Sequence, residues 1–364
     1  MDSKLQMSAE PRLYLDHAAT TPMVLPARTA AVDGMEYWAN PSSPHKEGRA
    51  AKAALEDARA RIGKALSWDG DIIFTSGASE ALSLALSRAN ADAMWISAVE
   101  HDAIHRACPT GHLLQVDDQG LVASETVMQA LKLEEALVPL VAIQSANNET
   151  GVIQDLTTLG LMIRERGAIF LTDCSQSAGK MPLPDADLIA VSAHKLGGPP
   201  GIGALLVRDL GQLSPSGGQE KGYRGGTENL PAVLGFAAAL EAGYGWFARA
   251  SKLRAELDAA IIAGGGFVVS GDTPRIATIA SYHMPGVSSS GQLIGFDMAG
   301  IAVSAGAACS SGTLKSSPVL AAMGWEAQAA SEVIRVSFGP GTTKADIARF
   351  IQAWQAIAKR SRNP

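Results

Sequence analysis

Five short apolar runs, each closed by polar or glycine-rich residues, constrain the fold of this 364-residue chain more than any other feature. Most of them are followed by a longer segment of helical character. The runs are continuous rather than alternating, which is typical of strands buried on both faces of a sheet. This succession predicts an α/β fold with a mainly parallel central sheet. The runs lie at 71–75, 93–97, 137–145, 168–172 and 188–191.

Polar side chains stand directly after these runs, at what would be the carboxyl ends of the strands. In open α/β sheets, ligands bind outside the carboxyl ends of the strands. The sequence therefore predicts one polar site at that edge of the sheet. Its candidate residues are Ser79, His101, Asn148, Asp173, Gln176, Ser192, His194 and Lys195.

The pattern changes after about residue 244. There we expect a helix over 248–263, strand-like runs at 267–270 and 276–282, a helix near 292–298 and a terminal helix from about residue 344. We expect two domains. The large domain would cover 14–247, and a smaller α+β C-terminal domain would cover 248–364 and include the N-terminal segment 1–13.

Composition and charge exclude several classes of protein. A net charge of −6 gives a field that repels a phosphate backbone, so no nucleic-acid partner is expected. The first ten residues are polar and contain no apolar stretch typical of a signal peptide. No apolar run approaches the roughly 20 residues that cross a bilayer. We expect a cytoplasmic protein that makes no contact with membranes.

Three cysteines, Cys108, Cys174 and Cys309, form neither a Cys-x-x-Cys motif nor an even set. A disulfide framework and a zinc ribbon are therefore not indicated, and a reducing compartment fits. His101 and His105 have the i,i+4 spacing of a metal pair, but no third ligand with suitable spacing is evident, so we expect no metal site.

Lys195 follows a predicted buried strand directly, and Asp173 stands at the end of the strand before it. A lysine in a dry site at a strand end can attack carbonyl groups, whereas taken alone it reads as an ordinary loop lysine. The pairing with Asp173 changes this interpretation. A lysine that forms a Schiff base and an aspartate that faces the pyridinium nitrogen are the pair that pyridoxal 5'-phosphate requires.

Three further features admit both a functional and a structural interpretation. The segment 76–79 before a predicted helix could bind a phosphate, with Ser192 and His194 as added donors, or could be an ordinary helix cap. His101 could stack on a cofactor ring and move protons, or serve a structural role. Cys309 lies among small residues at 304–312, where its thiol would be accessible to act as a nucleophile or would be incidental.

Together these motifs resemble the cysteine desulfurases, pyridoxal-phosphate enzymes of aminotransferase class V with the type I fold. The resemblance covers nearly the whole chain, and its motifs occur in order. They are YLDHAATTP (14–22), NPSS (40–43), FTSGASE (74–80), EH (100–101), NNETG (147–151), DCSQ (173–176), SAHK (192–195), GGQE (217–220), RGGTEN (224–229), SAGAACSS (304–311) and IRVSF (334–338).

The resemblance implies a role for each cofactor-binding residue. Lys195 would hold the cofactor and move the Cα proton, Asp173 would pair with the pyridine nitrogen, and His101 would stack over the ring and assist proton transfer. Asn148 and Gln176 would lie near the ring oxygen. The phosphate would be held by Ala78, Ser79, Ser192 and His194, and by Thr227 from the other subunit of a homodimer.

The resemblance also implies the reaction. Arg335, helped by Asn40, would clamp the carboxylate of L-cysteine, a bidentate task suited to guanidinium. Cys309 would attack the substrate sulfur, release L-alanine and carry a persulfide to a sulfur-acceptor protein, as in iron–sulfur cluster biogenesis. The alternatives are another class V reaction, transamination or selenocysteine lysis, in which Cys309 is incidental, and an inactive relative kept as a binding subunit.

The sequence departs from the family pattern at several positions. Ala193, Pro200, Gly225 and Ala307 stand where the family commonly has Gly, Lys, Ser and Ser, and Gly339 is followed by Pro340 in place of the usual Arg. The chain also ends soon after its last predicted helix, where the desulfurases that serve iron–sulfur scaffolds carry a longer tail. We therefore expect desulfuration more firmly than docking to such a scaffold.

Overall fold

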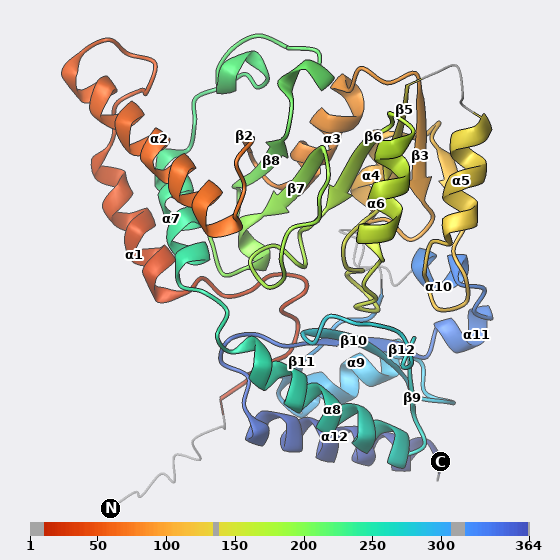
Figure 1. The fold of residues 1–364 in the computed structure, drawn as a ribbon. Helices are drawn as coiled ribbons and strands as arrows, with labels where there is room; N and C mark the ends of the chain where they lie inside the picture. The colour runs from red at the N-terminus through yellow and green to blue at the C-terminus, as the bar shows by residue number, and fades with distance from the viewer. Residues whose placement is uncertain (1–10, 134–137, 307–316, 363–364) are drawn as a thin grey trace, which may run out of the picture.

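The computed structural model describes residues 11–133, 138–306 and 317–362 (Figure 1). A seven-stranded sheet forms the centre of the larger part, with strand order β2-β8-β7-β6-β5-β3-β4. Every neighbouring pair is parallel except the two that involve β8. The strands are β2 (Asp71–Thr75), β3 (Ala93–Ser97), β4 (His112–Leu114), β5 (Pro139–Ala142), β6 (Ile169–Asp173), β7 (Leu188–Ser192) and β8 (Gly203–Val207).

The predicted α/β class is confirmed, and β2 and β3 cover the residues expected from the sequence. The sequence interpretation did not identify β4 and β8 of this sheet. β8 is the longer of the two. It follows β7 after only the residues 193–202. That connection is too short for the helical crossover that a parallel neighbour requires, so β8 runs antiparallel to β7.

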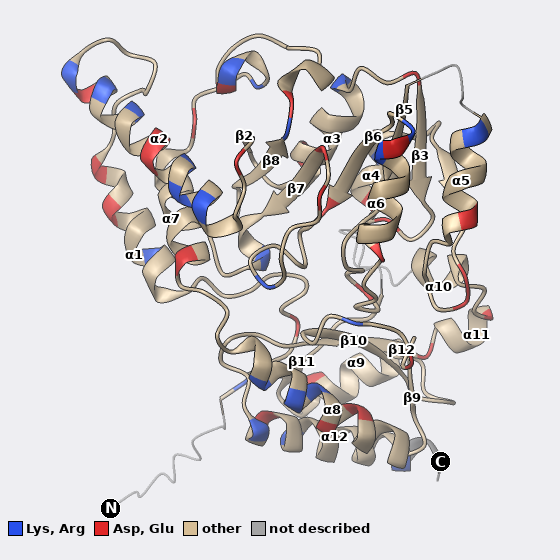
Figure 2. Cartoon of the chain, in the orientation of Figure 1, with Lys and Arg blue, Asp and Glu red and all other residues tan. Residues whose placement is uncertain are grey.

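Helices cover both faces of this sheet (Figure 1). The helices of this part are α1 (Leu25–Asp33), α2 (Lys46–Leu66), α3 (Ala78–Arg88), α4 (Asp102–Ala107), α5 (Ser124–Leu133), α6 (Leu156–Glu165) and α7 (Leu230–Glu241), with short 3-10 turns η1 (Gly34–Glu36), η2 (Ala193–Lys195), η3 (Leu210–Gln212) and η4 (Glu220–Gly222). Charged residues are concentrated on the helices and loops around the sheet (Figure 2).

Successive residues of one strand belong to different hydrophobic cores. Phe170 packs with residues of α2 and α7, whereas Ile169 and Leu171 pack with residues of α3 and α4. Both faces of β6 are therefore buried, as are all residues of β5, β7 and β8. This explains why the strands appear in the sequence as continuous apolar runs rather than alternating ones.

A second, smaller sheet lies below the first in Figure 1, with β10 (Ile279–His283) between β9 (Phe267–Val268) and β12 (Val333–Ser337), all antiparallel. The strand β1 (Leu13–Tyr14) pairs with β11 (Ile301–Ala302) beside it. The helices of the part with the smaller sheet are α8 (Phe247–Ala263), α9 (Ser289–Met298), α10 (Pro318–Ala322), α11 (Ala327–Ala330) and α12 (Lys344–Arg362). The division into domains at 14–247 and 248–364 remains a prediction.

The segment that follows β1 joins the two sheets. Asp16 forms a bridge with Ser337 of β12, and the Ser337 hydroxyl accepts a hydrogen bond from the Ala18 amide at 2.8 Å. Five residues after Asp16, Thr21 donates its amide to the His194 carbonyl at 2.9 Å and its hydroxyl to the Lys195 carbonyl at 3.2 Å. This segment therefore ties the smaller sheet to the turn that follows β7. Within the part of the chain that the structure describes, no helix has the length and hydropathy to cross a membrane.

The core of the smaller part depends on one aromatic cluster, in which Trp354 of α12 is 1% exposed and contacts the rings of Tyr282, Phe296 and Phe350. Replacing Trp354 with alanine leaves a cavity and is expected to lower the free energy of unfolding by about 3–5 kcal/mol. Urea unfolding followed by near-ultraviolet circular dichroism measures this loss. Ile262→Ala, at an exposed position of α8, serves as the control, with an expected change within about 0.5 kcal/mol. Equal losses in the two variants would contradict this assignment of the core.

Candidate active site

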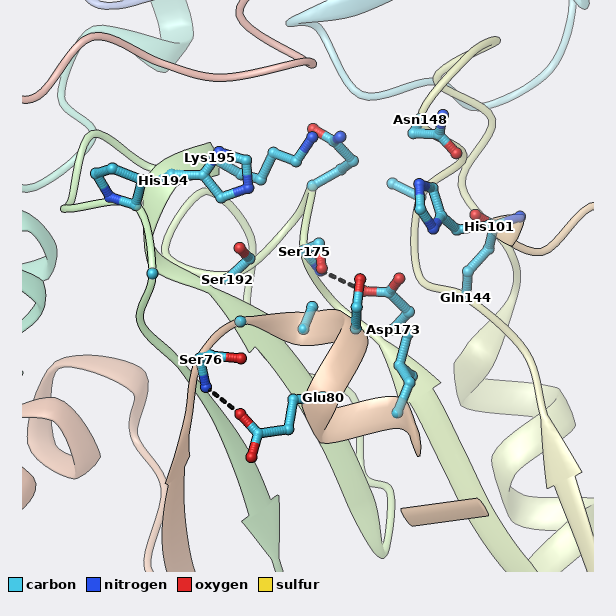
Figure 3. A pocket seen from close by; sticks show the side chains of 18 residues that line it. Ser76, Glu80, His101, Gln144, Asn148, Asp173, Ser175, Ser192, His194 and Lys195 are labelled. Carbon is cyan, nitrogen blue, oxygen red and sulfur yellow. Dashed lines mark hydrogen bonds between the residues drawn. The ribbon is translucent and has the colours of Figure 1, made fainter. Parts of the chain in front are cut away.

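A cavity of about 400 Å³ opens at the carboxyl ends of the central strands (Figure 3). Residues that follow β3, β5, β6 and β7 line it, together with the loop that joins β2 to α3. The structure thus brings together most of the residues predicted to form one polar site. These are Ala78, Ser79, His101, Asn148, Asp173, Gln176, Ser192, His194 and Lys195.

Lys195 ends the tight turn η2 directly after β7. Its Nζ donates hydrogen bonds to the carbonyl oxygens of Ala18 at 2.6 Å and Ala19 at 2.8 Å. Burial and, to a lesser extent, the positive charge of Arg335 lower the pKa of this amine to about 8, against the opposing charges of Asp173 and Asp16. A useful fraction of Lys195 is therefore neutral near pH 7, and the neutral amine is the nucleophilic form.

Asp173 ends β6 and is almost fully buried. One of its carboxylate oxygens accepts a hydrogen bond from the Ser175 amide at 2.8 Å (Figure 3). Beside it, the Ser175 hydroxyl and the Gln176 side-chain oxygen are buried and have no hydrogen-bond partner among the described residues. Buried polar atoms without partners are costly unless a ligand supplies the missing hydrogen bonds. These atoms therefore favour a polar ligand in this cavity.

The other end of the cavity presents hydrogen-bond donors that could hold an anion. The helix α3 begins at Ala78, and its first amides, with the hydroxyls of Ser79 and Ser192, supply hydrogen-bond donors. Burial, with a contribution from the Lys195 charge, lowers the pKa of His194 to about 4, so its imidazole is neutral and acts by hydrogen bonding. Glu80 accepts hydrogen bonds from the Ser76 amide at 2.5 Å and from Arg224 Nε at 2.7 Å. This links the 224–229 loop to the start of α3.

His101 is the N-cap of α4, and its Nδ1 accepts a hydrogen bond from the Ala103 amide at 3.2 Å. The neutral imidazole therefore carries its proton on Nε2. Burial lowers the pKa of His101, and the opposing charges of Asp173 and Lys195 also act on it. The backbone contact fixes both the tautomer and the ring position, which a residue that stacks on a ring and passes a proton requires.

Arg335 of β12 is buried beside the cavity rather than in its lining. Its guanidinium donates to the Asp16 carboxylate at 2.7 Å and to the Asn148 carbonyl at 2.9 Å. Asn40 and Thr227 are exposed and also lie outside the lining. One chain therefore does not bring these three residues into the cavity, and their predicted roles remain predictions. Cys309 lies outside the described residues.

The sequence interpretation did not include several polar residues that the structure places in or beside the cavity. Gln144 lies in the lining at the end of an apolar run, a position that could have identified it. Ser175 also lines the cavity. Asp16 is different, because its partner Arg335 is remote in sequence and only the fold brings the two together. Among the described residues, no cluster of three or more His, Cys, Asp or Glu could hold a metal ion.

The fold and the lysine-centred cavity define a class of protein: a family model described as aminotransferase class V matches residues 13–350. A putative cysteine desulfurase IscS 1 of Bacillus subtilis is 34% identical over 96% of this chain and 99% of its own length. A cysteine desulfurase of Gluconacetobacter diazotrophicus is also 34% identical, over 96% of this chain and 94% of its own. The chain belongs to the cysteine desulfurase family.

Solved structures agree with this assignment. The NifS-like protein of Rickettsia africae superposes with a TM-score of 0.87 at 31% identity, and covers 96% of this chain and 99% of its own. A second NifS-like protein superposes with a TM-score of 0.84 at 27% identity, over 96% of this chain and all of its own. These neighbours confirm the predicted type I fold.

The low pKa of the free Lys195 amine can be tested by competitive acetylation of the cofactor-free protein, read by mass spectrometry, with the exposed Lys252 as an internal reference. Because only the neutral amine reacts, the extent of Lys195 acetylation is expected to rise with pH to a midpoint of about 8. Arg335→Met removes a charge that lowers this pKa, so the midpoint moves upward. A wild-type midpoint at the ordinary lysine value of 10.5 would contradict the electrostatics described here.

Proposed function

We propose that this protein removes sulfur from L-cysteine, yielding L-alanine and a persulfide on Cys309 that passes to an acceptor protein. The observation that carries the proposal is the pairing of a buried, partly neutral Lys195 with Asp173 in one cavity, at the ends of adjacent parallel strands. The family relationship and the position of Cys309 within the motif 304–311 support the choice of substrate.

The residues present fit pyridoxal 5'-phosphate. The anion-binding start of α3 suits the phosphate, Asp173 suits a protonated pyridine nitrogen, and the unpartnered Gln176 oxygen suits a polar ring substituent. When bound, this cofactor withdraws electrons from the Cα of an amino acid joined to it. The phosphate donors would be Ala78, Ser79, Ser192 and His194, with Thr227 from a second subunit.

The remaining work falls to side chains of this protein. The Lys195 amine removes and returns the Cα proton, and its lowered pKa favours the neutral form that this step needs. The neutral imidazole of His101, which carries its proton on Nε2, donates a hydrogen bond from that nitrogen into the cavity. Arg335 and Asn40 hold the substrate carboxylate.

Sulfur transfer then balances without an external reductant. The Cys309 thiolate attacks the substrate sulfur, an S–S bond forms as the C–S bond breaks, and the bonding electrons remain on the substrate carbon. That carbon takes up a proton and leaves as the methyl group of alanine. One L-cysteine and one thiol therefore give one L-alanine and one persulfide.

We further propose a homodimer in the cytoplasm. Glu80 fixes the 224–229 loop beside the start of α3, so Thr227 is exposed near the edge of the site, where a second chain could receive it. Exposed apolar side chains on α1, on η1 and just beyond them provide an apolar surface for such an interface. They include Leu25, Val32, Met35 and Trp38, with exposed fractions of 57–80%.

Turnover of L-cysteine by the enzyme loaded with pyridoxal phosphate tests the proposed reaction. The wild type is expected to yield alanine and persulfide in equal amounts. Cys309→Ala removes the nucleophile and is expected to lower persulfide formation about 100-fold or more. Alanine measured by chromatography and sulfide released by a thiol reductant supply both quantities.

Cys108→Ala is the matched control, because that half-buried cysteine lies outside the cavity lining and its loss is expected to leave turnover unchanged. Full sulfur transfer by Cys309→Ala would contradict the proposal. Amino transfer to a keto acid by that variant would instead favour a transaminase.

A further inference from the structure

Glu149 is a buried carboxyl that the reaction described above does not use. Its side chain is 5% exposed and lies one residue after Asn148, which lines the cavity. The turn is shaped by Asn147, whose side-chain oxygen accepts hydrogen bonds from the amides of Glu149 at 2.8 Å and Thr150 at 2.9 Å. The backbone there is therefore fixed by contacts other than the Glu149 carboxyl.

The Glu149 carboxyl lies beside Gly306 and Ser317, the two described residues that flank the segment with Cys309. The Ser317 hydroxyl, at the far end, donates a hydrogen bond of 2.6 Å to Glu149 Oε2. At the near end, a Cβ placed on Gly306 would lie 3.4 Å from the same oxygen and 3.3 Å from Ser317 Cβ. The chain thus leaves this point at residue 306 and returns to it at residue 317.

The same turn is joined to Arg335. Its guanidinium donates to the Asn148 carbonyl at 2.9 Å. Its backbone forms a bridge with Ser304, with amide-to-carbonyl distances of 2.7 and 3.2 Å. A chain of contacts therefore links the cavity with the residues on both sides of the 307–316 segment. It runs through Asn148, Glu149, Ser317, Ser304 and Arg335.

Stability alone does not account for a carboxyl at this position. Burying a carboxyl costs more than burying an apolar side chain of similar size, and one hydroxyl is a weak compensation for an ionised group. Burial raises the pKa of Glu149, while the Ser317 hydrogen bond and the charge of Arg335 lower it. What the carboxyl provides, and an apolar residue would not, is a directional acceptor for Ser317.

We propose that Glu149 is a positioning residue for desulfuration: through Ser317 it fixes the ends of the 307–316 segment relative to Asn148 and Arg335. It thereby sets the place from which the Cys309 thiol approaches the substrate sulfur. The inference rests on the proposed function. Glu149 is assigned a role in the step that transfers sulfur. It is assigned no role in binding the cofactor or in recognising the substrate carboxylate.

The test compares Glu149→Ala with Glu149→Gln in the full chain loaded with pyridoxal phosphate. Glutamine keeps an oxygen that can accept the Ser317 hydrogen bond, and alanine does not. We expect kcat for alanine release to fall about tenfold or more in E149A, with KM for L-cysteine within about twofold, because misplacing a reacting group lowers the rate of the chemical step rather than binding. E149Q should retain most of kcat.

The absorbance of the bound cofactor and its response to L-cysteine provide the second readout. Both are expected to remain as in the wild type in E149A, because the step assigned to Glu149 comes later. Ser281→Ala is the matched control. Its buried hydroxyl donates to the Glu149 carbonyl at 2.9 Å, so the variant removes a hydrogen bond to the same residue and leaves the carboxyl untouched.

Ser317 gives an independent route if E149A does not fold. S317A removes the donor and is expected to lower kcat as E149A does, whereas S317T keeps the hydroxyl and restores it. E149A and S317A both within about twofold of the wild-type kcat would overturn the role of Glu149 while leaving the proposed function intact. So would loss of the cofactor response in E149A. Absence of alanine release from the wild type would overturn the proposed function, and the role of Glu149 with it.

Discussion

The rest of the site depends on the hydrogen bonds between the Lys195 amine and two backbone carbonyls. The carbonyls of Ala18 and Ala19 accept hydrogen bonds from Lys195 Nζ, and the Ala18 carbonyl also accepts one from the side-chain Nε2 of Gln176. Uncharged carbonyls orient the amine without neutralising it through an ion pair. Burial can therefore lower its pKa to about 8, which a direct carboxylate partner would oppose.

The charged groups around the cavity are few and of both signs. Lys195 and Arg335 face Asp173 and Asp16, while burial keeps His101 and His194 in their neutral forms. Each imidazole is then a defined hydrogen-bonding group rather than a further cation. A site arranged in this way can accept an anionic group at the start of α3 and a second anionic group near Arg335 without collecting unpaired positive charge.

The sequence predicted the strands well where burial on both faces made them continuous apolar runs. It predicted much of the cavity for a related reason, since polar residues that interrupt such runs at strand ends share one edge of the sheet. β8 was not predicted because a glycine-rich stretch precedes it, and that stretch carries no signal that the chain turns back antiparallel to β7. Contacts such as those of Asp16 with Arg335 and Glu149 with Ser317 join residues far apart in the chain. No local pattern contains them.

The pairing of β1 with β11 has a topological consequence. The chain begins its described course beside the smaller sheet, passes into the larger part after Asp16, and returns only at α8. The larger part is thus an insertion within the smaller one, and two covalent crossings connect them. The first crossing contains Ala18 and Ala19, whose carbonyls accept the hydrogen bonds of the Lys195 amine. The position of that amine therefore depends on the path by which the chain enters the larger part.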